Sequence, residues 1–333
     1  MRNLGKLAVL GITALGLALA GPQDNSLVIG ASQEPRVLAG DFLSVISNQA
    51  IKSEIEQYLF APFIGFNADS QNFPVLATEV PTLENGRLRV TDIGGGKKRL
   101  EMDITIRPDA KWSDGRPITT EDVAFYFEVG KAKGMPVLNP DFWERVNVRI
   151  KDARNFTLIF EPAYYYDTYG PINTYAPKHI MGPEWERVKA AARGLDPQKD
   201  AEKLNELYRN FFIKFSTPQA LNRGAMVYSG PFMLRRWVPG NSIEMVRNPN
   251  FPIKPEGGES KYVQKVVYRF IQNTNSLLVA VIGGSIDATS SVSLTFDQGR
   301  SPQLVRRAPG RFDIWFVPGA IWEHIDINKF ENC

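Results

Sequence analysis

Few side chains in this sequence are of the types that carry out chemistry, and they are widely spaced. The chain has two histidines, His179 and His324, and one cysteine, Cys333. A nucleophilic enzyme needs a serine or cysteine beside a base that a third group orients, and the sequence contains no G-x-S-x-G segment. A single cysteine forms neither a disulfide framework nor a CxxC metal motif. We therefore expect no enzyme activity, no metal site and no cofactor.

Aromatic residues are concentrated between Tyr164 and Tyr175, a segment that also contains Pro171. Tyrosines have an apolar ring and a polar hydroxyl, so a loop rich in them suits the wall of a ligand site or a face between two domains. The same residues would also serve to pack a small core. Both interpretations stay open on the sequence alone.

The bulk composition is that of an ordinary globular protein. Of the 333 residues, 43% are hydrophobic and 23% are charged, which excludes a disordered or fibrous chain. This length predicts about two domains. The 39 basic and 36 acidic residues nearly balance, and the basic residues occur only in short runs such as Lys97-Lys98-Arg99. A nucleic-acid-binding protein would gather them on one face, so we expect no nucleic-acid partner.

The first twenty residues have the pattern of a secretory signal peptide. Arg2 and Lys6 give a positive start, and the apolar run Leu7 to Ala20 ends in the small-x-small pattern Ala18-Leu19-Ala20. A membrane-spanning helix needs about 20 apolar residues, and this run is shorter. We predict cleavage near Ala20 and a periplasmic or extracellular location. An uncleaved membrane anchor is the alternative.

Hydrophobic alternation predicts many short β-strands along the rest of the chain. Residues Ser26 to Ala31 form an apolar run typical of a buried strand. Alternating segments within 87–106 flank Gly94-Gly95-Gly96 and predict a hairpin. Further strands are expected at 63–66, 146–150, 157–160, 232–237, 243–246, 263–271, 286–288, 312–317 and 325–327.

Helical spacing predicts a smaller set of helices between these strands. Residues 47–60 have apolar residues at helical intervals, with Ser47 as the expected cap. Thr119 and Asp122 have the spacing of a capping box and open a helix through Val129. Further helices are expected within 183–214, on the surface, and at 276–282, which ends at Gly283-Gly284.

Four blocks of sequence resemble one family, the extracellular solute-binding proteins of peptide-type ABC importers, which include oligopeptide and dipeptide binders. The blocks are LVIGASQEPRVLAGDF (27–42), RPDAKWSDGRPITTEDVAFYFE (107–128), YSGPFMLRRWVPGNSIEMVRNPNF (228–251) and IQNTNSLLVAVIGGSIDAT (271–289). A single block would be a weak signal, but four in this order make a specific match. Most of the matching residues belong to turns, caps and strands, so the resemblance concerns the scaffold more than the ligand.

The resemblance implies an α/β fold of the periplasmic-binding-protein type, with two lobes, mixed sheets and an inserted domain. The first lobe would be discontinuous and take residues 27–64 and 170–289, with the inserted domain at 65–169. The second lobe would begin at 290 and run to 333, where the chain stops short of the family's usual length. We therefore expect the second lobe to be incomplete.

The resemblance also implies where a ligand would be held. The family places a cleft loop after the first strand, which corresponds here to Gln33, Glu34, Pro35 and Arg36. The hinge would lie at Ser290 and Ser291, and the second lobe would contribute Trp322, Glu323 and His324. Glu34 is expected either to meet the amino end of a ligand or to form a surface salt bridge. His324 is expected either to contact a ligand or to lie on a strand surface.

Three interpretations of the function follow. In the first, two lobes close by a hinge motion around a peptide or peptide-like solute, bind an extended peptide through its backbone, and deliver it to an ABC permease in the inner membrane. In the second, the chain is a truncated or split remnant that binds little alone or needs a complementary carboxy-terminal chain. In the third, it is an exported hydrolase that uses His179 or His324.

Overall fold

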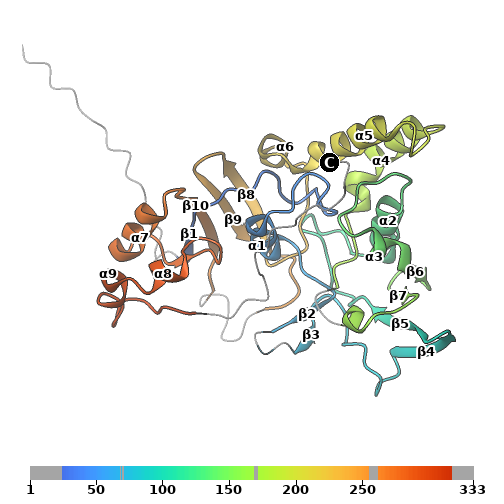
Figure 1. Cartoon of the computed structure of the whole chain (residues 1–333), viewed down its shortest axis with the longest axis horizontal. Coiled ribbons are helices and arrows are strands. Elements are labelled where there is room, and N and C mark those ends of the chain that lie inside the picture. The colour runs from blue at the N-terminus through green and yellow to red at the C-terminus, as the bar shows by residue number, and fades with distance from the viewer. Residues whose placement is uncertain (1–24, 68, 70, 169–171, 255–261, 317–333) are drawn as a thin grey trace, which may run out of the picture.

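The computed structural model describes residues 25–316 apart from 68, 70, 169–171 and 255–261. The predicted signal peptide, the strand expected at 325–327, the cleft residues Trp322, Glu323 and His324, and Cys333 lie outside the described residues. The described strands form a five-stranded, a four-stranded and a two-stranded sheet, and helices pack around them (Figure 1).

The five-stranded sheet has the order β11-β1-β10-β9-β8. Its strand β1 is parallel to both of its neighbours, β10 and β11, whereas β8, β9 and β10 pair antiparallel. The strands are β1 (Ser26–Ala31), β8 (Phe232–Val238), β9 (Ser242–Arg247), β10 (Lys265–Phe270) and β11 (Ala288–Thr289). The predicted strands at 26–31, 232–237 and 243–246 are confirmed, and the one predicted at 263–271 is slightly shorter.

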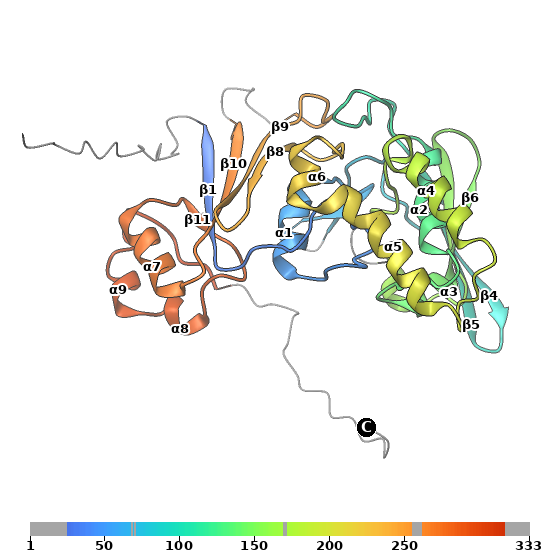
Figure 2. The ribbon, with the colours of Figure 1, turned by 90° about the horizontal axis from the view of Figure 1, so that it is seen from above.

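Side chains of β1 point alternately to the two faces of this sheet. Ile29 and Ala31 belong to a large core that also contains residues of α1 (Ala50–Leu59). Val28 points the other way and packs with Leu277 of α7 (Thr274–Gly283). The two helices therefore cover opposite sides of β1 (Figure 2).

Gly30 makes the close approach of α7 to β1 possible. A Cβ atom at this position would lie 2.5 Å from side-chain atoms of both Leu277 and Ile286. Real Cβ atoms do not approach other carbon atoms so closely, so a larger residue would require the Cδ1 atoms of Leu277 and Ile286 to move. Glycine at this position therefore lets these two side chains pack directly on the β1 backbone.

The four-stranded sheet is antiparallel, with the order β4-β5-β7-β6. Its strands are β4 (Leu88–Gly94), β5 (Lys97–Thr105), β6 (Val146–Ile150) and β7 (Asn155–Phe160), which confirms the predicted hairpin. On one face, Leu100, Met102 and Ile104 of β5 join a second core. On the other, Glu101 and Asp103 form ion pairs with Arg89 of β4, Arg149 of β6 and Lys151, which directly follows β6.

Helix α2 (Thr120–Gly130) packs against this sheet and begins as the sequence predicts. Thr119 and Asp122 form a complete capping box. The Asp122 carboxylate also accepts hydrogen bonds from Trp112 Nε1 (3.2 Å) and from the backbone N–H of Lys178 (3.0 Å). One buried carboxylate thus joins the start of α2 to the preceding turn and to the start of α4.

The remaining helices gather at two ends of the molecule. Helices α4 (Lys178–Ala192) and α5 (Ala201–Ser216) pack together at one end, through Trp185 and Tyr208 among others. Helices α7, α8 (Phe296–Gly299) and α9 (Pro302–Val305) lie at the other end (Figures 1 and 2). The other short elements are β2 (Ile64–Phe66), β3 (Asn72–Pro74), α3 (Pro140–Arg145), the 3₁₀ turn Tyr165–Thr168 and α6 (Pro218–Asn222).

Two local predictions are wrong. Helix α1 does not begin at Ser47: its cap is Gln49, without a side-chain cap bond, because Asp41 accepts the backbone N–H groups of residues 45–47 and holds them in a loop. Residues 312–316 form no strand. A strand needs a partner for its backbone groups, and Trp315 in this segment is 81% exposed.

Asp122 gives a test of this fold. Replacing Asp122 by Asn leaves one acceptor oxygen for three N–H donors, and we expect the free energy of unfolding to fall by about 1–3 kcal/mol. Urea denaturation measures this change. The matched control is Glu121→Gln on the same helical turn, where the side chain is 73% exposed and the expected change is within about 0.5 kcal/mol. Equal effects of the two substitutions would contradict the structural role of Asp122.

Candidate functional site

The carboxyl ends of β1, β10 and β11 meet at one edge of the five-stranded sheet because the three strands are parallel. The chain leaves β1 toward α1 on one face of the sheet, and leaves β10 into α7 on the other. In open α/β sheets, ligands bind outside the carboxyl ends of strands where the connections diverge in this way. We call the segments 32–36, 271–273 and 290–293, which lie at this edge, the rim.

Hydrogen bonds join two of the rim segments directly. The backbone N–H of Ser32 donates to Ser293 Oγ (3.2 Å), and the Ser32 hydroxyl donates to the carbonyl of Val292 (3.2 Å). The N–H of Ser290 donates to the carbonyl of Gly30 at 2.9 Å. The loop that follows β1 and the segment predicted as the hinge therefore lie side by side.

Glu54 of α1 fixes the predicted hinge residues to the body of the protein. One carboxylate oxygen accepts a hydrogen bond from the Tyr268 hydroxyl at 2.9 Å. The other accepts from the Ser290 hydroxyl (2.9 Å), the Ser291 N–H (3.0 Å) and the Ser291 hydroxyl (2.6 Å). Burial, together with Tyr58 and Glu54 nearby, raises the pKa of Tyr268, so its hydroxyl stays a donor. That Ser290 and Ser291 act as a hinge is still a prediction.

Glu34 lies in the rim and ties it to the β8–β9 turn. Its two carboxylate oxygens accept hydrogen bonds from Trp237 Nε1 and from the backbone N–H of Gly240, each at 2.8 Å. Both partners are neutral donors, so among the described residues these contacts take the place of the expected salt bridge. Glu34, Trp237 and Gly240 all belong to the sequence blocks that resemble the family. This shared membership was the only indication in the sequence of a contact between them. Contact of Glu34 with the amino end of a ligand stays a prediction.

The other predicted cleft residues differ in accessibility. Gln33 and Arg36 are exposed, whereas Pro35 is buried. The backbone N–H of Arg36 donates to Gln49 Oε1 at 2.8 Å, next to the start of α1. Within the rim, Gln33 and Arg36 are therefore the predicted residues whose side chains are open to a ligand, and their role in binding stays a prediction.

The aromatic segment at 164–175 divides between surface and core. Tyr165 is 82% exposed, and the Arg145 guanidinium stacks over the ring of Tyr164 at 3.9 Å. Tyr175 is buried, and its ring packs against Phe63 and Trp112. Tyr175, at the end of this segment, therefore packs in the core, whereas Tyr165 lies on the surface.

His179 is the one histidine within the described residues, and its contacts are with Asp114 and Trp112. The Nε2 atom of His179 lies 3.0 Å from the Asp114 carboxylate, and its ring packs against Trp112; His324 lies outside the described residues. Across the described ranges, no group of three or more metal-binding side chains occurs. None of the helices in this same part of the chain is long and apolar enough to cross a bilayer.

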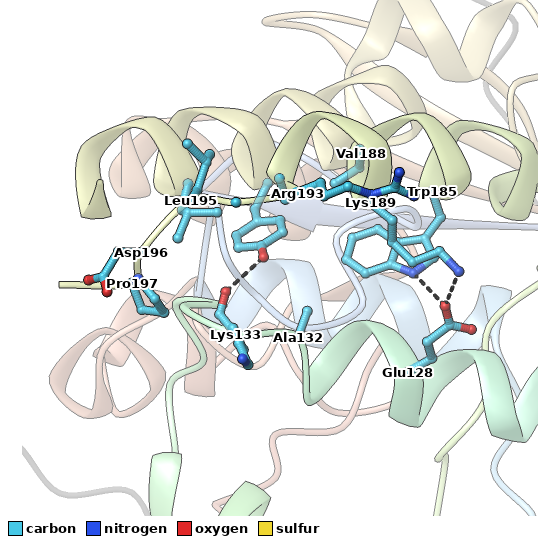
Figure 3. A pocket seen from close by; sticks show the side chains of 14 residues that line it. Glu128, Ala132, Lys133, Trp185, Val188, Lys189, Arg193, Leu195, Asp196 and Pro197 are labelled. Carbon is cyan, nitrogen blue, oxygen red and sulfur yellow. Dashed lines mark hydrogen bonds and ion pairs between the residues drawn. The ribbon is translucent and has the colours of Figure 1, made fainter. Parts of the chain in front are cut away.

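Two cavities lie away from the rim. The smaller, about 580 Å³, is an open pocket lined by residues of α2, α4, α5 and the loop between α4 and α5. Figure 3 shows that Trp185 and Lys189 both point toward Glu128. The Tyr208 hydroxyl donates a hydrogen bond to the Lys133 carbonyl at 2.8 Å. These polar groups already satisfy one another, which favours a structural role for this cavity.

The larger cavity measures about 720 Å³ and runs along α1 toward β2 and β3. We call it the α1 cavity. Most of its walls are apolar, and Lys52 and Glu56 stand among them. The residues that line it are Ala39, Phe42, Ser44, Lys52, Ser53, Glu56, Gln57, Phe60, Ala61, Pro62, Gly65, Phe66, Phe73, Val75, Tyr126, Asn173, Tyr175, Ala176, Pro177, Met226, Pro231, Phe251 and Ile253.

Comparison with known proteins gives matches over most of the chain. Residues 97–320 match the model of the bacterial extracellular solute-binding proteins, family 5. Among curated proteins, the oligopeptide-binding protein AppA of Bacillus subtilis is 23% identical over 80% of this chain and 40% of its own length. A probable ABC transporter-binding protein of Deinococcus radiodurans is 27% identical over 58% of this chain and 30% of its own.

Solved structures agree with these matches. An oligopeptide binding protein from Thermus thermophilus, complexed with a pentapeptide, is 97% identical with a TM-score of 0.92, over 94% of this chain and 52% of that one. AppA from Bacillus subtilis, in complex with a nonapeptide, shares the fold with a TM-score of 0.53 at 20% identity, over 79% of this chain and 43% of that one. The chain thus spans about half the length of the Thermus protein and less of the others.

Glu54 gives a test of the rim. A glutamine at position 54 keeps the shape but replaces one acceptor oxygen by an N–H₂ group, so some of the four donors lose their partner. We expect faster amide hydrogen exchange over 290–293, equivalent to a loss of about 1–3 kcal/mol in local stability. Glu186→Gln on α4, where the side chain is 69% exposed, is the control. Unchanged exchange at Ser291 in Glu54→Gln would contradict the contact.

Proposed function

The chain belongs to family 5 of the bacterial extracellular solute-binding proteins, and from that premise we propose that it captures peptides or peptide-like solutes for an ABC importer. The observation that carries the proposal is the similarity to the Thermus thermophilus oligopeptide binding protein, at 97% identity over 94% of this chain. That protein was solved with a pentapeptide. At such identity, almost all side chains within the matched part of the two chains are the same.

The rim is the surface we assign to the ligand. It lies at the carboxyl ends of three parallel strands, and carboxylates at positions 34 and 54 hold two of its segments in place. An extended peptide gains affinity from backbone hydrogen bonds to an exposed chain segment. A segment that is already ordered loses little entropy when it binds. Gln33, exposed at the start of the rim, is the residue we expect beside the peptide.

We assign residues 27–64 and 170–289 to a first lobe, 65–169 to an inserted domain, and residues from 290 onward to a second lobe. Two features support this division: the strands of the five-stranded sheet fall within or next to the first lobe's ranges, and those of the four-stranded sheet fall within 88–160. Ser290 and Ser291 then stand at the passage between lobes. Closure of the lobes would bury the ligand and present one conformation to a permease.

The signal-peptide pattern of residues 1–20 supports export and cleavage near Ala20. The family itself is extracellular, in agreement with a periplasmic or external site of action. The proposal includes no catalytic step. His179, the one histidine that the structure describes, is paired with Asp114.

The alternative of a remnant with weak binding has support of its own. The match covers 52% of the Thermus protein, and several apolar side chains of the segment after Ser290 are exposed, among them Phe296 at 60% and Trp315 at 81%. Apolar patches of this kind mark surfaces that contact another partner. A cleft needs two walls, so we expect capture to depend on sequence beyond this chain.

A titration with peptides tests both interpretations. The chain from Gly21 onward is titrated with a pentapeptide pool by calorimetry, alone and mixed with the part of the Thermus protein that lies outside the match. We expect weak binding alone and at least about tenfold tighter binding in the mixture, which is about 1.4 kcal/mol. The intact Thermus protein is the positive control.

The outcomes of the titration separate the hypotheses. Restoration of binding by the added part would support peptide capture that needs a second wall. Failure of the mixture, with the Thermus protein binding normally and the chain folded by circular dichroism, would leave the remnant interpretation. A response to free amino acids or sugars but not to peptides would overturn the assigned ligand class.

A further inference from the structure

One face of α1 turns a charged stripe toward the α1 cavity. Lys52 and Glu56 are four residues apart, so their side chains follow one another along the same side of the helix. Both line the cavity, as does Phe60, which directly follows the helix. The Lys52 side chain is only 3% exposed, and that of Glu56 is 20% exposed. Glu54, which holds the rim, makes its contacts with Tyr268 and Ser291 and does not line the cavity.

The ammonium group of Lys52 has no capacity left for a ligand. It forms an ion pair with Glu56 at 3.1 Å and donates hydrogen bonds to the Asp41 carbonyl (3.0 Å) and to Ser44 Oγ (3.3 Å). A lysine has three N–H donors, and these three partners use all of them. An anion entering the cavity would find no free donor at Lys52.

The carboxylates beside Lys52 outnumber it. Glu56 accepts the backbone N–H of Ala39 at 2.9 Å as well as Lys52, and the Asp41 carboxylate accepts backbone N–H groups of residues 45–47. With both acids ionised, the cluster carries one excess negative charge. Burial raises the pKa of Glu56 to about 7 although Lys52 opposes this shift, since a charge removed from water is costly unless it is compensated.

Aromatic rings form much of the wall near this charge. Phe42, which follows the loop residue Asp41, packs against Tyr126 of α2 with ring centroids 5.4 Å apart. Both rings line the cavity, as do Phe60, Phe66 and other aromatic residues. The faces of such rings attract cations, and several rings around a pocket form the usual site for an organic ammonium group.

We propose that the α1 cavity binds a small organic cation, an ammonium group on an aromatic or branched apolar body. The charge would rest between the Glu56 carboxylate and the rings of Phe42 and Tyr126, and the apolar body would lie along the wall toward β2 and β3. The volume of about 720 Å³ is within the range of small-molecule sites, about 300–1,000 Å³. This site is additional to peptide capture at the rim and does not depend on it.

The proposal predicts a specific pH dependence. A permanently charged probe does not titrate, so any change in its affinity comes from the protein. As pH rises through about 7, Glu56 loses its proton, and the affinity for a cation should increase between pH 6 and pH 8. The other titratable groups of the cluster and cavity wall are Lys52, Asp41, Tyr126 and Tyr175. Burial raises the pKa of both tyrosines, so they stay neutral in this range.

Calorimetry with two probes of similar size tests the site in the full chain. Benzyltrimethylammonium carries the cation, and N,N-dimethylbenzamide is its uncharged counterpart. We expect the cation to bind at least about tenfold more tightly at pH 8, and Glu56→Gln to remove this preference and its pH dependence. The matched control is Glu101→Gln on β5, whose side chain is also 20% exposed and paired with an arginine, and which should leave both affinities unchanged.

A second substitution keeps the test independent of the charge. Phe42→Leu retains an apolar wall but removes one ring face. It should therefore lower the affinity for the cation by a few fold and leave the affinity for the amide unchanged. Thermal unfolding of each variant checks that it is folded. Equal affinity for the two probes, or a Glu56→Gln variant that binds the cation as tightly as the parent chain, would overturn the proposal. A pH dependence that persists in Glu56→Gln would assign it to Asp41 and likewise overturn the role of Glu56.

Discussion

The parallel pairing of β1 with β10 and β11 is the constraint on which the rest of the structure depends. Residues 26–31 pair with 265–270 on one side, and residues 29–30 pair with 288–289 on the other. The sheet therefore forms only when distant parts of the chain meet. Parallel strands need long crossover connections, and here the connection from β1 to β10 contains the four-stranded sheet and the α4–α5 pair. The rim exists because this pairing brings three carboxyl ends to one edge.

Helix α1 makes contacts on three of its sides. Ile51 and Ile55 pack in the main core, Glu54 bonds to the segment after β11, and Glu56 faces the α1 cavity. A helix whose three sides are all engaged cannot turn without changing each of them, since packed interiors do not deform continuously. One short helix therefore contributes to both the rim and the α1 cavity, on different sides.

Sequence patterns predicted the elements whose causes are local. Strand β1 is a short apolar run, and the box at Thr119 and Asp122 needs only four consecutive residues. The prediction at Ser47 was wrong because a carboxylate six residues earlier took the N–H groups of the loop. The contacts of Glu54 could not be predicted, because its partners lie 214 to 237 residues further along the chain. Nothing in the pattern around an acidic residue in a helix reveals such partners.

Buried or half-buried carboxylates connect distant segments of this protein, and these connections affect how a ligand would be held. Glu34, Glu54 and Asp122 each join segments that are far apart in sequence through N–H or O–H donors. Charge-assisted bonds of this kind are stronger than bonds between neutral groups, so two segments of the rim are ordered before any ligand arrives. In the proposed capture, little of the free energy of binding would then be needed to order this wall. The affinity would instead be governed by the surface that closes over the ligand from the other side, because that is where ordering and desolvation still have to occur.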